Sequence, residues 1–181
     1  MQINNNYSSP NFGMALRIKP EAMEALKKLP MEKLESLEKI GENLKDTKYY
    51  HLEIGENVTP RIVSPYANKY SDVFEVEKPK ELYPEVLPFK SIWDGTEISG
   101  KKKGAICEGE IKYSSKEAAL EAYNKINKAS SELETAALLT RELDNREIEL
   151  AALKAAQRAL EKAQEEKATN LFDKFGVKEA E

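Results

Sequence analysis

From Ile111 to Phe175 the chain contains no glycine and no proline. The stretch is dense in alanine, leucine, glutamate, lysine and arginine, which have the highest helix propensities. Because glycine and proline most often end or break a helix, we expect the stretch to be helical almost throughout. One straight helix from Ser115 to Phe175 would measure roughly 90 Å at about 1.5 Å per residue. The chain therefore either extends as a long helix or folds back on itself.

Two serine motifs divide this helical stretch. The segment Ser114–Glu117 has the spacing of a capping box, in which a serine hydroxyl and a glutamate three residues later satisfy free N–H groups at a helix start. The segment Ser131–Glu134 repeats the pattern and predicts a break between Asn127 and Ser131. Residues 114–181 are therefore predicted to form a helical C-terminal region, either a helical hairpin or an extended helix.

Residues 14–113 show shorter and more varied periods. Apolar residues at helical spacing predict a pair of short helices near residues 20–29 and 34–44. Alternating apolar and polar residues predict strands, and turn residues separate them. Since short strands joined by tight turns favour antiparallel pairing, we expect an α+β domain with a small, mainly antiparallel sheet of four to six short strands. The expected strands cover residues 14–18, 49–54, 58–63, 73–76, a hairpin around Asp94–Gly95, and 105–113; Pro60 places the third at a sheet edge.

The charge balance argues against two classes of partner. One third of the residues are charged, yet the net charge is only -4, so the chain lacks the basic field that binds nucleic acid or anionic lipid. The N-terminus has no signal-peptide pattern, and no stretch has the roughly 20 apolar residues of a membrane span. We expect a cytoplasmic protein with a flexible tail at residues 1–13, and no nucleic-acid or membrane partner.

The sequence is poor in the residue types that carry chemistry. Cys107 is the only cysteine and His51 the only histidine, which excludes an internal disulfide, a thiolate metal cluster and a histidine-rich metal site. A dyad of Cys107 and His51 lacks a third residue to orient it, and free cysteine is among the most buried residue types. We therefore predict a buried Cys107, no catalytic residues, no metal and no cofactor.

A ligand site on the predicted sheet is the alternative interpretation of the sequence. Trp93 and Asp94 would provide a stacking surface and a carboxylate, and Glu108 and Glu110 would add two carboxylates from a nearby strand. Paired carboxylates can hydrolyse a glycosidic bond, and an exposed tryptophan can stack on a sugar. This pattern suggests a small hydrolase or a carbohydrate-binding module. The same residues are also typical of a core aromatic and a solvated sheet face.

The predicted function rests on the C-terminal helices. Apolar residues lie on two sides of the second helix, a leucine stripe and an alanine stripe from Ile148 to Ala163, which implies more than one partner surface. The leucines follow coiled-coil spacing, although Arg146, Gln157 and Gln164 interrupt it. We predict a non-catalytic interaction or structural protein that binds another protein or a second copy of itself. The candidate interaction residues are Leu139, Leu143, Leu150, Leu153, Leu160, Phe172 and Phe175.

Overall fold

The computed structural model describes residues 15–64, 69–94 and 104–176. Contacts divide the chain into two units, Met1–Arg146 and Glu147–Glu181, and each is described by itself. The strands are β1 (Leu16–Ile18), β2 (His51–Ile54), β3 (Pro60–Ser64), β4 (Lys69–Val76), β5 (Val86–Asp94) and β6 (Ile106–Lys112). The α-helices are α1 (Met23–Leu26), α2 (Met31–Leu44), α3 (Lys116–Asn127) and α4 (Glu132–Phe175), with short 3-10 turns at Pro20–Ala22 and Glu56–Val58.

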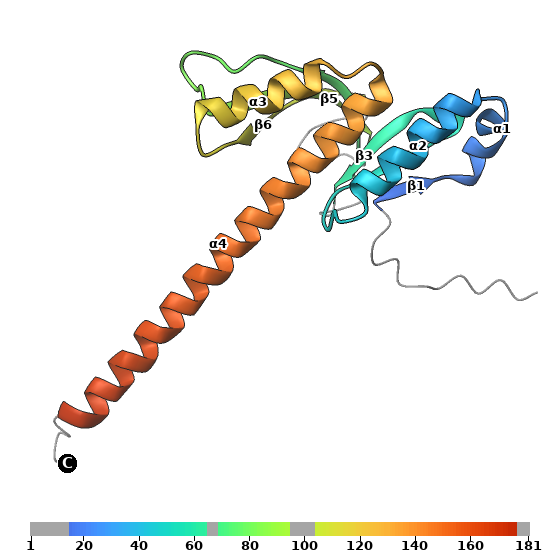
Figure 1. Ribbon diagram of the computed structural model, residues 1–181. Coiled ribbons are helices and arrows are strands. Elements are labelled where there is room, and N and C mark those ends of the chain that lie inside the picture. The colour runs from blue at the N-terminus through green and yellow to red at the C-terminus, as the bar shows by residue number, and fades with distance from the viewer. Residues whose placement is uncertain (1–14, 65–68, 95–103, 177–181) are drawn as a thin grey trace, which may run out of the picture. The chain divides into compact units, whose positions relative to one another are not determined.

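The six strands form one sheet in the order of the sequence, β1 to β6. β1 pairs with β2 in parallel, since the helical pair lies between them, and every later pairing is antiparallel. The β3–β4 pairing is short, running from Ile62 opposite Ser71 to Ser64 opposite Lys69. The sheet therefore consists of two three-stranded halves, β1–β3 and β4–β6, and Figure 1 shows them carrying α2 and α3 respectively.

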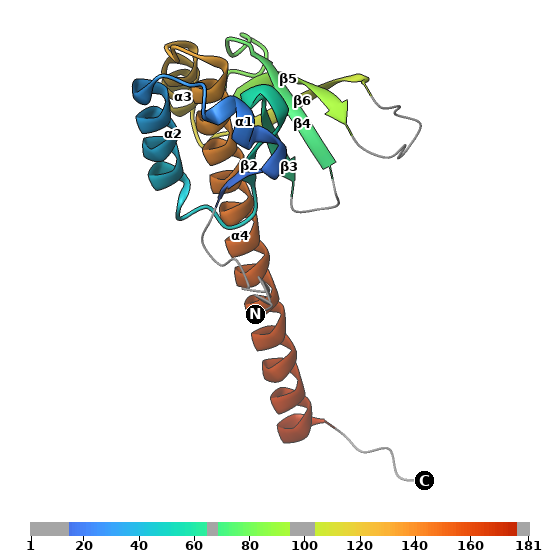
Figure 2. The same cartoon turned by 90° about the vertical axis from the view of Figure 1, so that its right-hand side faces the viewer.

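The hydrophobic core lies between this sheet and the helices. Figure 2 shows α2 and α3 on the same side of the sheet. Leu37 and Leu44 of α2 and Ile126 of α3 are buried together with Leu52 of β2 and Leu87 of β5. The structure confirms the predicted α+β fold with short helices, a mainly antiparallel sheet and a long C-terminal helix.

The predicted break in the helical stretch is confirmed by its hydrogen bonds. Ser115 caps α3 by accepting a bond from the backbone N–H of Ala118. Ser131 does the same for α4 with the N–H of Glu134, while the carboxylate of Glu134 accepts a 2.7 Å bond from the N–H of Ser130. This bond and one from the Ser130 hydroxyl lower the pKa of Glu134. The two caps start separate helices on either side of residues 128–131.

The first turns of α4 connect the two halves of the sheet. On the β4–β6 side, the hydroxyl of Tyr113, just after β6, donates a 2.8 Å hydrogen bond to Glu142. On the β1–β3 side, Arg141 donates to the carbonyl of Asn43 in α2. Ala136 and Leu139 are buried in the core that both halves share. α4 therefore holds together two halves that the short β3–β4 pairing joins only weakly.

The strongest of these connections is the carboxylate of Asp144. It is 1% exposed and accepts hydrogen bonds from three consecutive backbone N–H groups just before β2. The distances are 3.0 Å from Lys48 and 2.8 Å from Tyr50, and Tyr49 donates as well. Hydrogen bonds to a carboxylate are about twice as strong as those between neutral groups. Asp144 thus fixes the entry of the chain into β2 from a helix far along the sequence.

Two details of the sheet differ from the prediction. β3 is a central strand between β2 and β4, and not an edge strand, because Pro60 is its first residue, where a missing N–H breaks no ladder bond. The alternating residues of 49–54 predict a half-buried strand, but β2 is covered on both faces, since Glu53 is only 7% exposed and forms a 3.4 Å ion pair with Lys19. The predicted tail at residues 1–13 and the return strand after Gly95 lie outside the described residues.

We expect Asp144→Asn to destabilise the protein by about 3 kcal/mol. The change removes the negative charge that strengthens the hydrogen bonds to Oδ1, and it places an NH₂ group against the Lys48 N–H that Oδ2 now accepts. Equilibrium urea unfolding, followed by circular dichroism, measures the difference. Asp173→Asn makes the same chemical change at an exposed position of the same helix and should stay within about 0.5 kcal/mol of the unaltered protein. Equal stabilities of the two variants would contradict the role given to Asp144.

Candidate interaction site on the C-terminal helix

The helix α4 changes character along its length. In its first part the buried side chains are mainly small or polar, namely Ala136, Ala137, Thr140 and Asp144, with Leu139 among them. The hydroxyl of Thr140 is satisfied within the helix by the carbonyl of Ala136 at 2.7 Å. From Ala152 to Phe175 every side chain is exposed. Any apolar surface that α4 leaves exposed therefore lies in its second part, in the unit from Glu147 onward.

Large hydrophobic side chains in this second unit are open to solvent. Leu153, Leu160 and Leu171 are 63%, 59% and 52% exposed, and Phe172 and Phe175 are 69% and 70% exposed. Single exposed hydrophobic residues are normal on any protein, but a contiguous group of them marks an interaction surface. Exposed hydrophobic residues on the long C-terminal helix thus form a possible binding surface.

Most of these residues lie on one face of the helix, which we call the leucine face. Successive members are three or four residues apart, so each lies about one turn beyond the last. The spacing follows the heptad pattern up to Gln164, where two steps of four replace the alternation, as in a coiled coil with an inserted stutter. The leucine face consists of Leu150, Leu153, Gln157, Leu160, Gln164, Ala168, Leu171 and Phe175.

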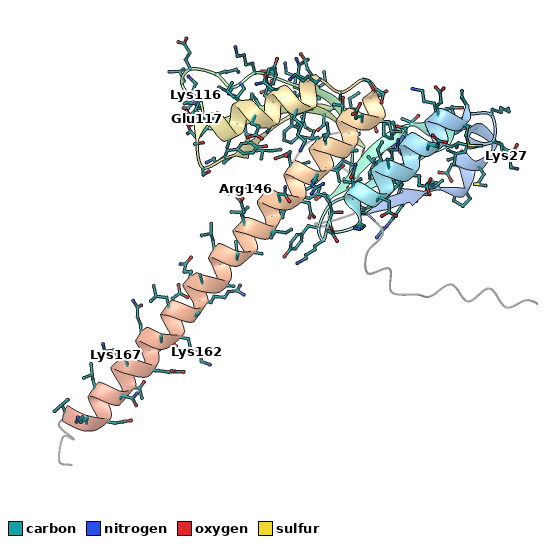
Figure 3. The ribbon with its side chains drawn as sticks, viewed as in Figure 1. Lys27, Lys116, Glu117, Arg146, Lys162 and Lys167 are labelled. Carbon is teal, nitrogen blue, oxygen red and sulfur yellow. The ribbon has the colours of Figure 1, made fainter. Side chains whose placement is uncertain are left out.

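No member of the leucine face carries a charge, although 33% of the chain is charged. The charged side chains of this unit lie on the other faces, where some form pairs one turn apart. Lys162 is 3.9 Å from Glu166 on such a face, while Gln157 of the leucine face donates a 3.1 Å hydrogen bond to Glu161. Figure 3 shows Lys162 and Lys167 extending from α4 in different directions. The pairs support an exposed helix, and the uncharged face stays available for an apolar partner.

The helix ends with an aromatic pair and a glycine. The N–H of Gly176 donates a 2.7 Å hydrogen bond to the carbonyl of Phe172. A Cβ atom at Gly176 would overlap that carbonyl, so a larger residue there would displace the closing turn. Lys174 lies 5.3 Å from the ring centroid of Phe175, a cation–π distance. The glycine end therefore holds both rings in the last turn.

The predicted interaction residues fall into two groups. Leu139 is 1% exposed and Leu143 packs against the core, so both belong to the packing of the first unit. Leu150 is half-buried, and Leu153, Leu160, Phe172 and Phe175 are exposed. In the predicted alanine stripe, Ala152, Ala155, Ala159 and Ala163 are exposed as well. Only the second group is placed to meet another molecule.

The residues of the alternative ligand site are only partly described. Trp93 and Asp94 lie in β5, opposite Ser71 and Tyr70 of β4, and their side chains lie outside the described residues. Glu108 and Glu110 are exposed on β6, opposite Lys90 and Pro88 of β5. Lys90 pairs with Glu77, which raises the pKa of Lys90 and lowers that of Glu77. A lysine thus lies among these strand carboxylates.

Phe89, Cys107 and His51 do not come together in a site. The ring of Phe89 lies over Gly109 of the neighbouring strand, where a Cβ atom would overlap it, and packs against the core. Cys107 is half-buried rather than fully buried, because it lies beyond the part of β6 covered by the core, and its Sγ is 3.7 Å from the Ala105 carbonyl. β3, β4 and β5 separate His51 from Cys107 by roughly 19 Å, so this pair does not meet.

Two clefts among the described residues of the first unit are lined by residues other than the predicted ligand residues. An apolar groove of about 410 Å³ lies between β1 and α2, lined by Leu16, Leu34 and Leu37 among others. A more polar pocket of about 490 Å³ lies beside the turn at Gly55–Thr59. Among the described residues, no group of three or more His, Cys, Asp or Glu side chains is arranged to hold a metal ion.

Comparison with known proteins adds no assignment. No protein-family model, no curated protein and no solved structure matches the chain. Within the part of the chain that the structure describes, no helix combines the length and hydrophobicity that crossing a bilayer requires. The candidate site therefore rests on its own geometry.

Asp144 is the residue of most structural consequence that the sequence pattern did not single out. It lies on the face of α4 that also carries Ala136, Ala137 and Thr140, which precede it by eight, seven and four residues. An acidic residue at the end of a stripe of small residues is the sequence feature that points to it. Its partners, however, are 94 to 96 residues away.

His51 makes the stability of the first unit sensitive to acid. Burial, helped by the positive charges of Arg17 and Lys19, lowers its pKa from 6.5 to about 4. Its Nε2 atom is buried without a hydrogen-bond partner among the described residues. The folded protein therefore resists protonation of this ring, whereas the unfolded chain accepts a proton near pH 6.5.

We expect this difference to reduce the free energy of unfolding as the pH falls. A group with a lowered folded pKa contributes stability above its unfolded pKa, and that contribution is lost between about pH 6.5 and pH 4, by up to about 3 kcal/mol. Urea unfolding at several pH values, compared between the unaltered protein and His51→Gln, isolates the effect. The variant should lose less stability in this range. Two parallel pH profiles would show that His51 does not cause the loss.

Proposed function

We propose that this chain is a non-catalytic interaction protein in which α4, from Glu147 to Phe175, binds another protein molecule through its leucine face. The observation that carries the proposal is the uncharged leucine face, with Leu153, Leu160 and Leu171 more than half exposed. Covering a leucine side chain contributes about 1.5–3 kcal/mol relative to leaving it in water, so several in a row favour association.

The anchoring of α4 supports the same proposal. The helix starts at the Ser131 cap, contributes Leu139 to the core and is fixed by Asp144, all within the first unit. It then continues without interruption to Phe175. A preformed helix does not have to be ordered when a partner binds, which lowers the entropic cost of association. Helices of this kind bind a groove or another helix through apolar residues one turn apart.

The alternative of a small hydrolase or carbohydrate-binding module stays a prediction. It requires Trp93 and Asp94 to form a pocket with Glu108 and Glu110. The first two side chains lie outside the described residues, and the two glutamates are exposed. No specific observation favours this function over protein binding.

A photo-crosslinking amino acid placed on the helix tests the proposed function. We expect p-benzoylphenylalanine at position 160, on the leucine face, to give one discrete crosslinked product in the cells that produce the protein. The same group at position 162, where Lys162 lies on the opposite side of the helix, should give none. Mass spectrometry identifies the crosslinked protein and distinguishes a copy of this chain from a different protein.

A second substitution separates specific binding from chance contact. Changing Leu153 and Leu171 to Asp should abolish the product at position 160, because each buried charge costs far more than a leucine contact contributes. Changing Ala155 and Ala159 to Asp places the same charges on another face and should leave the product unchanged. Equal crosslinking at positions 160 and 162, or none at either, would refute the proposal.

A further inference from the structure

We infer that the partner of the leucine face is a second copy of this chain, and that the two helices pair in parallel with matching residues opposite each other. This inference rests on the proposed function and specifies its partner. It follows from three properties of residues 147–175: the length of the uncharged face, the position of its two glutamines, and the placement of the charges beside it.

The length of the face is sufficient for a stable pair. From Leu150 to Phe175 it extends roughly 40 Å at about 1.5 Å per residue. That length equals three to four heptads, and the stutter after Gln164 is a local change of winding that coiled coils accommodate. Acidic and basic side chains are close to balanced between Glu147 and Phe175, so two copies do not repel each other through net charge.

The two glutamines favour parallel, in-register pairing. In that arrangement each glutamine lies opposite the same glutamine of the second chain. The amide of each one offers a donor and an acceptor to the amide of the other. The amide of Gln157 donates one hydrogen to Glu161, which leaves a second hydrogen and the carbonyl oxygen for the copy. Polar residues at such positions fix the register of a coiled coil.

In an antiparallel pair that overlaps over the same residues, from Leu150 to Phe175, the glutamines no longer lie opposite each other. Gln164 would then face Leu160, and Gln157 would face Ala168. Each buried amide would meet an apolar side chain and leave its hydrogen bonds unmade, which is unfavourable. An antiparallel pair centred on Leu160 would place Gln157 opposite Gln164 but would leave Phe175 outside the contact. Only the parallel, in-register pair both matches the glutamines and buries the whole leucine face.

The charges beside the face agree with the parallel arrangement. Glu149 precedes Leu150 and Lys154 follows Leu153, so they occupy the two positions that flank a coiled-coil contact. In a parallel pair Glu149 of each copy lies beside Lys154 of the other, which gives two attractive contacts. Further along, the corresponding positions at Ala156 and Ala163 are small and uncharged, so no like charges oppose each other there.

Sedimentation velocity of the purified full-length chain over a wide dilution series tests for the second copy. We expect a reversible monomer–dimer equilibrium. Leu153→Asp with Leu160→Asp should weaken it at least about 100-fold, whereas Ala155→Asp with Ala159→Asp should leave it unchanged. Circular dichroism confirms that both variants retain their helix. A chain that stays monomeric at every concentration would overturn the inference, while a crosslink at position 160 to a different protein would leave the proposed function standing.

Disulfide formation tests the direction and register. In a Cys107→Ala background, Gln157→Cys should form an intermolecular disulfide on mild oxidation, because matching residues face each other, and Lys162→Cys on the opposite side should not. A dimer in which the cysteine at position 157 stays reduced, or in which both positions oxidise equally, would overturn the parallel, in-register arrangement.

A charge exchange tests the flanking pair. Lys154→Glu should weaken the dimer about threefold to thirtyfold, because two attractive contacts become repulsive. Adding Glu149→Lys should restore it, since the pair is then reversed and attractive again. A double variant no tighter than Lys154→Glu alone would overturn the assigned pairing of Glu149 with Lys154.

Discussion

The arrangement of the first unit depends on one carboxylate. Asp144 is buried, and it accepts hydrogen bonds from the backbone of Lys48, Tyr49 and Tyr50 just before β2. The β3–β4 pairing between the two sheet halves is too short to set their arrangement alone. Because α4 also contacts the other half through Glu142 and Tyr113, Asp144 completes a bridge across the sheet.

The composition of α4 reflects two different surroundings. In the first unit the helix lies close to the sheet and other helices, and Ala136, Ala137 and Thr140 let it approach them closely. Beyond Arg146 the same helix carries Leu153, Leu160 and Phe175 in solvent. A helix that served only as a spacer between two domains would gain nothing from these larger apolar side chains, because exposed apolar patches favour aggregation. Their alignment on one uncharged face gives the second unit a possible binding surface.

The features that the sequence predicted correctly depend mainly on local residue patterns. The caps at Ser115 and Ser131 and the α+β class follow from residues close together in the sequence, so they were predicted. The central position of β3 was missed because Pro60 can begin a strand as well as lie at an edge. Asp144 was missed because its contacts join residues 94 to 96 positions apart. The leucine face was only partly predicted, since the heptad spacing holds only to Gln164 and does not lead to Ala168.

The late position of the bridging helix has a consequence for how the chain is made. The segment Lys48–Tyr50 leaves the ribosome well before Asp144, and at about 5–20 residues per second the interval is roughly 5 to 20 s. Throughout that time the β1–β3 half lacks the acceptor for its backbone N–H groups, and water must occupy them. The first unit therefore cannot close during the synthesis of its strands. Its folding is timed by the arrival of the helix that also carries the exposed leucines.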